Sequence, residues 1–337
     1  MRPRFTRDDL FELMAIAVLT PIAWLLPPAA WQPVGHAISV AIARLWPAVT
    51  RARVATLAAA LRGHTIDLPL ADLRVAILDG YMEERLAILR AHRPGGWRPR
   101  LRLVGREHLK AALAGGTGGV LWTAPFSHAD LVIKMALAES GFALDHLSAS
   151  TRGFSPNACF QRHPSRFGMR VLSPLRTRVE DRHLRARISM ASDGSLAYAR
   201  QIDRRLRANG LVSIRAGEHG QRTVEARFLA GTIRLATGAP SLALASGAPL
   251  LPVFSVRTGP GVYDVVVEPP LRDDAPPEHA AGDRHRLVDA LTRSYARLLE
   301  RYVLRRPQDW SGWYTMRLGA KPAAAPLAAS RAARKAV

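Results

Sequence analysis

The chain has 337 residues, enough for one large domain with appendages. Its 48 Lys and Arg residues outnumber 27 Asp and Glu residues, which gives a formal net charge of +21. This charge favours a polyanionic partner, either anionic membrane headgroups or nucleic acid. An Arg-rich composition that comes from a GC-rich genome is the alternative explanation of the excess. The single cysteine, Cys159, excludes an intramolecular disulfide and a cysteine-based zinc cluster.

The N-terminal region is apolar over two stretches, Leu10 to Trp31 and Val34 to Trp46. Three prolines interrupt the first stretch, so a straight spanning helix of about 20 residues is only one interpretation. No small-residue cleavage site follows, which argues against a cleaved signal peptide. We expect a membrane anchor or an interfacial helix with Trp side chains at the headgroup boundary. The alternative is a buried core helix.

The next part of the chain alternates between helical and strand patterns. Helices are predicted over 51–62, 70–91 and 107–114, with a strand over 98–104. Farther along, strands are predicted over 142–150, 169–172, 211–215, 249–256 and 263–268, and helices over 194–209, 233–246 and 283–301. This alternation predicts an α/β fold in which helices flank a mostly parallel sheet.

The same patterns divide the chain into three parts. Residues 1–46 are expected to form membrane-associated apolar helices, and residues 47–317 the α/β domain. Residues 318–337 are rich in Ala, Pro and basic side chains, a composition typical of a disordered tail.

The stretch from Gly118 to Leu137 holds the main candidate site. Its apolar period changes from two to 3.6 between Pro125 and Asp130, which predicts a strand, a loop and a helix. Pro125 ends the strand because it lacks an amide N–H, and Ser127 or Asp130 can accept from the first turn of the helix. His128 and Asp130 are therefore expected at the carboxyl end of a strand, the usual place for chemistry in α/β folds.

Other short motifs follow in a fixed order: Arg166-Phe167-Gly168-x-Arg170-Val171, Glu268-Pro269-Pro270-Leu271 and Pro307-x-Asp309-Trp310-x-x-Trp313. Together with Thr123-Ala124-x-Phe126-x-x-x-Asp130-Leu131, their order and spacing resemble the bacterial lipid A late acyltransferases, the lauroyl and myristoyl acyltransferase family. The similarity runs from the N-terminal apolar helix to about Arg317. It implies a glycerolipid acyltransferase-like α/β enzyme on the cytoplasmic face of the bacterial inner membrane, which moves a fatty acyl chain from a thioester onto a hydroxyl.

The chain departs from the family at the catalytic motif, a His followed five positions later by an acidic residue. Counting back five from Asp130 gives Pro125, and counting forward five from His128 gives Ile133. In the standard arrangement, the imidazole takes the proton of the attacking hydroxyl and the carboxylate orients the imidazole. We predict that His128 and Asp130 fill these roles. The alternatives are a binding or vestigial site and a cluster that only caps the helix.

Further candidates line the rest of the predicted domain. Arg152, Arg166 and Arg170 could clamp a phosphate of the acceptor or the donor, unless they form a solvated basic face. Glu218 falls at a strand end and could position the acceptor. If His128 is not the base, the remaining candidates are His146, His163 and Glu218.

The run from Pro174 to Arg182 alternates charges. It predicts surface ion pairs or a headgroup site, and Arg176 and Glu180 have the spacing of an ordinary helical ion pair. No metal-ligand spacing, such as two His four apart beside a Glu, is found in the sequence. We expect neither a metal nor a cofactor, because a thioester is already an activated acyl donor.

The preferred function is transfer of a fatty acyl group from acyl carrier protein or coenzyme A to a hydroxyl or amine of a lipid or lipid-like acceptor. Acyl carrier protein is the favoured donor, and anionic membrane lipid is the expected second partner. One alternative keeps the fold but binds acyl chains or lipids without catalysis, because Pro125 replaces the family's His. Another, nucleic-acid binding, lacks both an aromatic-basic stacking pattern and a reading helix.

Overall fold

A seven-stranded sheet forms the centre of the protein. The computed structural model describes residues 3–45, 55–126, 128–149, 165–190, 197–218, 220–272 and 284–319. The strand order is β1-β9-β8-β2-β5-β3-β4, and only the β8/β9 pair is antiparallel. The mostly parallel sheet predicted from the sequence is therefore confirmed. Its strands are β1 (Arg100–Val104), β2 (Gly119–Thr123), β3 (Leu144–Ala149), β4 (Ala186–Met190), β5 (Leu211–Arg215), β8 (Leu250–Gly259) and β9 (Val262–Val267).

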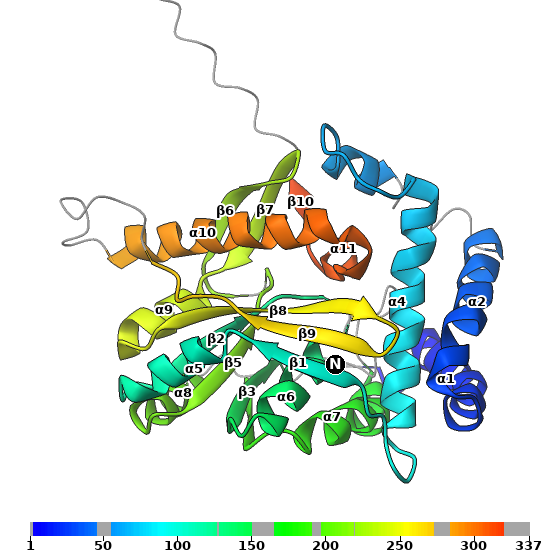
Figure 1. Cartoon of the computed structure of the whole chain (residues 1–337), viewed down its shortest axis with the longest axis horizontal. Helices are drawn as coiled ribbons and strands as arrows, with labels where there is room; N and C mark the ends of the chain where they lie inside the picture. The colour runs from blue at the N-terminus through cyan, green and yellow to red at the C-terminus, as the bar shows by residue number, and fades with distance from the viewer. Residues whose placement is uncertain are drawn as a thin grey trace, which may run out of the picture.

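Helices cover both faces of this sheet, as Figure 1 shows for α10 on one side and α6 on the other. A smaller antiparallel sheet, in the order β10-β7-β6, packs against α10 through β6. The helices are α5 (Arg106–Ala114), α6 (Ala129–Glu139), α7 (Ser173–Asp181), α8 (Ala197–Arg207), α9 (Gly238–Ser246), α10 (Arg284–Arg305) and the short α11 (Gly312–Thr315). The smaller sheet contains β6 (Thr223–Phe228), β7 (Gly231–Ala236) and β10 (Leu318–Gly319).

Strand β2 lies in the middle of the core between β5 and β8, and all five of its residues are buried. Its sequence, Gly-Val-Leu-Trp-Thr, is apolar on both faces, as expected for a parallel strand covered by helices on both sides. Trp122 stacks on Tyr295 of α10 with ring centroids 3.9 Å apart. The loop that follows β2 therefore starts from a rigid support.

Two predicted elements are wrong. Residues 169–172 form no strand but belong to a π-helical turn, η2 (Gly168–Leu172), that leads directly into α7. A four-residue apolar run cannot by itself distinguish a strand from a helix, and Pro174 favours a helix start. The predicted helix over 233–246 is divided into β7 and α9, because β7 pairs with β6 as a hairpin.

The N-terminal region forms α1 (Arg7–Leu25), the 3-10 turn η1 (Pro28–Ala30) and α2 (Trp31–Leu45). Both helices pack on α4 (Leu70–Arg90), on the side of α4 that faces away from the sheet (Figure 1). Glu12 of α1 forms a buried ion pair of 2.7 Å with Arg85 of α4. No described helix combines the length and apolar character needed to cross a membrane.

Helix α4 stands at the end of the sheet toward which β8 points (Figure 1). Strands β2, β5, β3 and β4 run in the same direction as β8, because each neighbouring pair is parallel. Five carboxyl ends therefore face the side that carries α4, with α1 and α2 beyond it. The 3-10 turn η4 (Pro307–Asp309), which follows α10, packs against α4 at this end.

Candidate functional site

An ion pair between Asp130 and Arg215 lies at the carboxyl ends of two central strands. Asp130 belongs to the first turn of α6, just after the loop that follows β2. Arg215 is the last residue of β5 and pairs in register with Thr123, the last residue of β2. The guanidinium contacts the carboxylate directly, and the two side chains are only 8% and 9% exposed.

The C-terminal segment completes this site through Ser311. The hydroxyl and the backbone N–H of Ser311 both donate to the carbonyl oxygen of Pro125, at 2.7 and 2.8 Å. One guanidinium nitrogen of Arg215 lies 3.5 Å from the Ser311 hydroxyl. Phe126 forms a bridge with Trp310. Pro125 thus offers this site only a carbonyl oxygen, which Ser311 already binds.

His128 does not form the predicted pair with Asp130 in this structure. Its backbone is left-handed, with φ of 59°, and its ring lies between Trp97 and Tyr263, with centroids 5.6 and 5.1 Å away. Within the described part of the chain, neither ring nitrogen has a hydrogen-bond partner. Burial, together with the positive charge of Arg257, lowers the pKa of His128 to about 3. The ring is therefore neutral at physiological pH, and with so low a pKa its nitrogens are weak proton acceptors, which makes His128 poorly suited to act as the base.

An ion pair between α4 and β8 lies next to the aromatic side chains that surround His128. Glu83 of α4 forms a 2.7 Å ion pair with Arg257 of β8. The Tyr263 hydroxyl donates to Glu83 at 3.3 Å. Burial raises the pKa of Glu83 above its usual value and that of Tyr263 well above its own. These contacts hold Tyr263, one of the two aromatic neighbours of the imidazole, in place.

A second buried ionic cluster holds α6 behind Asp130. Glu180 of α7 contacts Lys134 and Arg176 at 2.7 Å each and Arg187 at 2.8 Å. Burial opposes ionisation of Glu180, but Arg176 and Lys134 outweigh it, so the pKa of this carboxyl falls below its usual range. Lys134 lies one helical turn after Asp130. The cluster therefore ties the helix that carries Asp130 to α7 and β4.

The predicted phosphate-binding arginines lie elsewhere or outside the described residues. Arg166 and Arg170 are exposed, in a segment whose backbone bonds to the residues before α1: the Arg166 N–H donates to the Pro3 carbonyl oxygen at 2.9 Å. Asp130 and Arg215, by contrast, lie at the carboxyl ends of β2 and β5. Arg152 lies outside the described residues, so its role stays a prediction.

The other candidate bases also occupy separate places. Glu218 follows β5 and accepts a hydrogen bond from the backbone N–H of Arg317. His146 is buried in β3 with its Nδ1 2.8 Å from the Ser213 hydroxyl, and burial together with nearby Lys134 brings its pKa well below the usual value. His163 lies outside the described residues.

Sequence reasoning missed Arg215 and Ser311. The available signal was position: Arg215 ends a predicted strand, and Ser311 directly follows Asp309-Trp310 in the last motif. What the sequence does not display is that β5 lies next to β2. In the described ranges, no group of three or more His, Cys, Asp or Glu side chains could hold a metal ion.

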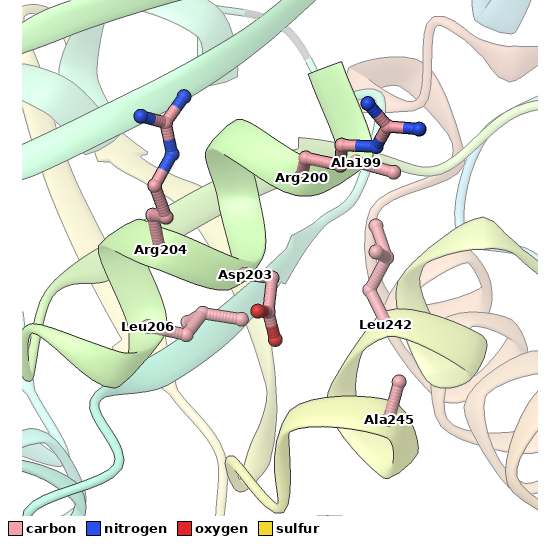
Figure 2. A pocket seen from close by; sticks show the side chains of 7 residues that line it. All are labelled: Ala199, Arg200, Asp203, Arg204, Leu206, Leu242 and Ala245. Atoms are coloured by element: carbon pink, nitrogen blue, oxygen red, sulfur yellow. The ribbon is translucent and has the colours of Figure 1, made fainter. Parts of the chain in front are cut away.

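A groove of about 570 Å³ lies between α8 and α9, away from this site. Figure 2 shows Arg200, Asp203 and Arg204 of α8 at its rim and Leu242 of α9 beside them. Both helices lie on the side of the molecule opposite α4 (Figure 1). The groove is therefore not part of the Asp130–Arg215 site.

Comparison with known proteins identifies the family to which the chain belongs. A family model described as bacterial lipid A biosynthesis acyltransferase matches residues 84–318. The matched region contains the whole sheet, Asp130, Arg215 and Ser311, and begins after α1 and α2. No match was found among curated proteins.

Proposed function

Because the chain belongs to the bacterial lipid A biosynthesis acyltransferase family and is an acyltransferase, we propose that it moves a fatty acyl group from an acyl thioester to a hydroxyl or amine of a lipid acceptor at the cytoplasmic face of the bacterial inner membrane. The observation that carries this proposal is the Asp130–Arg215 pair at the shared carboxyl end of β2 and β5. It places a carboxylate and a cation where α/β enzymes perform chemistry. Acyl carrier protein or coenzyme A supplies the thioester.

The proposed reaction uses Asp130 as the proton acceptor. The acceptor oxygen attacks the thioester carbonyl carbon while its proton passes to the Asp130 carboxylate. The carbon–sulfur bond then breaks, and the departing thiolate takes the proton from Asp130. Arg215 holds the carboxylate in place and offers positive charge to the oxyanion that forms on the carbonyl. His128, whose ring is buried beside Trp97 and Tyr263, anchors the end of the loop where α6 begins.

The second candidate function is binding of acyl chains or lipids by the same fold, without acyl transfer. Pro125 stands where the family has its His, and the ring of His128 is enclosed by Trp97 and Tyr263. Both observations favour a relative that binds acyl chains or lipids without transferring them. The two candidates differ in one observable, the consumption of the thioester.

The exposed side of α1 supports a place at the membrane surface. Leu19 and Ala23 of α1 are buried in the core, whereas another row of its apolar side chains is 47 to 81% exposed: Leu10, Phe11, Met14, Val18 and Leu25. This row lies on a helix packed against the outer side of α4, at the end of the molecule that holds the site. We propose that α1 lies in the interface of an anionic membrane, with its apolar row among the acyl chains.

We expect the variant carrying Leu10→Glu, Met14→Glu and Val18→Glu to lose binding to anionic vesicles. Burying a large apolar side chain contributes about 1.5–3 kcal/mol, so three such losses remove most of the interfacial affinity. Flotation with vesicles made from bacterial inner-membrane lipids measures binding, and a labelled acyl thioester measures transfer to the lipids. Both should fall, while the melting temperature stays unchanged because these side chains face outward.

The matched control carries Val104→Glu, Ala111→Glu and Ala114→Glu, three exposed positions of β1 and α5 at the opposite end of the molecule. It has the same change in net charge and should float as the unmodified protein does. If the α1 variant remains folded and floats equally well, the apolar row does not contact lipid and the interfacial placement is wrong.

A further inference from the structure

Four exposed arginines follow one another along α10. Arg293, Arg297, Arg301 and Arg305 are four residues apart, so they lie along one side of the helix over about 18 Å at 1.5 Å per residue. Two partly buried carboxylates of α10 lie near them: Glu300, and Asp289 one turn before Arg293, which pairs with Arg222 at 2.5 Å. The opposite side of α10 is buried in the core through Tyr295, Leu298, Leu299 and Tyr302. We call these four residues the α10 arginine row.

Most of the charge in this row is not neutralised within the chain. Arg293, Arg301 and Arg305 form no ion pair with any residue that the structure describes. Arg297 donates to the Ser294 hydroxyl at 2.9 Å, and Arg305 lies over the Tyr302 ring at 6.0 Å. Like charges four residues apart on a helix repel one another. A complementary anionic partner would relieve this repulsion.

The row leads toward the proposed active site. Helix α10 runs along the sheet and ends beside α4, where η4 follows it (Figure 1). Ser311, two residues after η4, contacts Arg215 and the Pro125 carbonyl. A partner seated on the row would therefore have one end next to the Asp130–Arg215 pair.

The direction of the row separates it from the membrane surface. Helices α1 and α2 lie beyond α4, whereas α10 extends from α4 back along the sheet, on the other side (Figure 1). A bilayer in contact with α1, as proposed above, lies beyond α4, and most of α10 extends away from it. A soluble partner therefore fits the row better than lipid headgroups do.

We propose that the α10 arginine row is the docking surface for a soluble acidic protein that carries the acyl thioester. This inference rests on the proposed function, since it assigns the donor to this site. Carboxylates repeated along one helix of the carrier would match cations repeated at about 6 Å on α10. The phosphates of a free coenzyme A are clustered at one end of the molecule and match fewer of these cations.

The test compares two double charge reversals in the full-length protein. One variant carries Arg293→Glu and Arg301→Glu in the row. The control carries Arg200→Glu and Arg204→Glu, two exposed arginines on α8 with no ion pair among the described residues (Figure 2). Both variants change the net charge equally. The probe is purified acyl carrier protein loaded with a fatty acyl chain, and its Kd is measured at low salt.

We expect the row variant to weaken carrier binding by about tenfold or more, as loss of charge pairs at an interface does, and the α8 control to bind like the unmodified protein. The KM for the carrier-bound donor should rise in parallel. Transfer from acyl-pantetheine, a small thioester without a protein, should stay unchanged in both variants, as should vesicle flotation.

Equal carrier binding by the row variant and the α8 control would show that the α10 arginine row is not the docking surface. So would an equal loss of transfer from acyl-pantetheine, because the substitutions would then act on the reaction rather than on docking. If the unmodified protein consumes neither thioester, the proposed function fails, but the difference in carrier binding still decides whether the row is the docking surface.

Discussion

We expect Glu180→Gln to lower the free energy of unfolding by about 3–5 kcal/mol, the cost of removing one partner from a buried ion pair. The reason is that Lys134, Arg176 and Arg187 all contact this carboxylate within 2.8 Å, and the Lys134 and Arg176 side chains are only 3% and 4% exposed. The amide would leave these cations without a counter-charge in the interior. Thermal and urea unfolding measure the loss directly.

Asp181→Asn is the matched control. Asp181 contacts Arg187 at 2.7 Å, but its side chain is 47% exposed, so the expected loss is below about 1 kcal/mol. The effect of Glu180 should also depend on pH. Its pKa is lowered in the folded protein, so its contribution is present above the pKa of the unfolded chain and is lost as the pH falls below that value. A loss for Glu180→Gln as small as the one expected for Asp181→Asn would show that the cluster does not stabilise the fold.

The second large effect concerns activity. We expect Asp130→Asn to reduce acyl transfer by about 10² to 10⁴, the range for loss of a general base. The amide keeps the shape of the side chain beside Arg215 but can no longer take the proton of the acceptor. Initial rates with a labelled thioester, at a temperature where both proteins are folded, give the ratio. Binding of the acceptor should be nearly unchanged.

His128→Phe is the informative comparison for the same site. A phenyl ring preserves the stack between Trp97 and Tyr263 but has no nitrogen, so transfer should be little affected. Stability should change little, because the imidazole already has the positive φ of this position and its buried nitrogens have no hydrogen-bond partner among the described residues. If the folded variant loses as much activity as Asp130→Asn does, His128 leaves its pocket and acts as the base that its sequence position predicts.

The location of the site could be predicted from local sequence, but its partners could not. The apolar run before Pro125 and the change of period after it predict a strand, a loop and a helix, and the structure has β2 and α6 there. The pairing of Asp130 with Arg215 depends on β5 lying next to β2, although β3 and β4 come between them in the chain. Strand order is a property of the whole fold, so no local pattern displays it.

Side-chain direction was the second feature that periodicity could not supply. His128 and Asp130 are two residues apart, and the left-handed backbone of His128 accompanies a ring that enters the core. The helical spacing of Arg176 and Glu180 correctly predicted their ion pair. That spacing did not reveal that the pair is buried and shared with Lys134 and Arg187, because both cations come from other elements.

One measurement tests the central claim, acyl transfer at the Asp130–Arg215 site, most directly. The protein is incubated with vesicles of bacterial inner-membrane lipids and an isotopically labelled acyl thioester, and mass spectrometry follows the lipids while a thiol reagent follows the donor. We predict that lipid species heavier by one labelled acyl group appear, that one thiol is released for each, and that Asp130→Asn suppresses both. An intact thioester, with labelled acyl chains bound to the protein and no acylated lipid, would contradict this account and identify a binding protein.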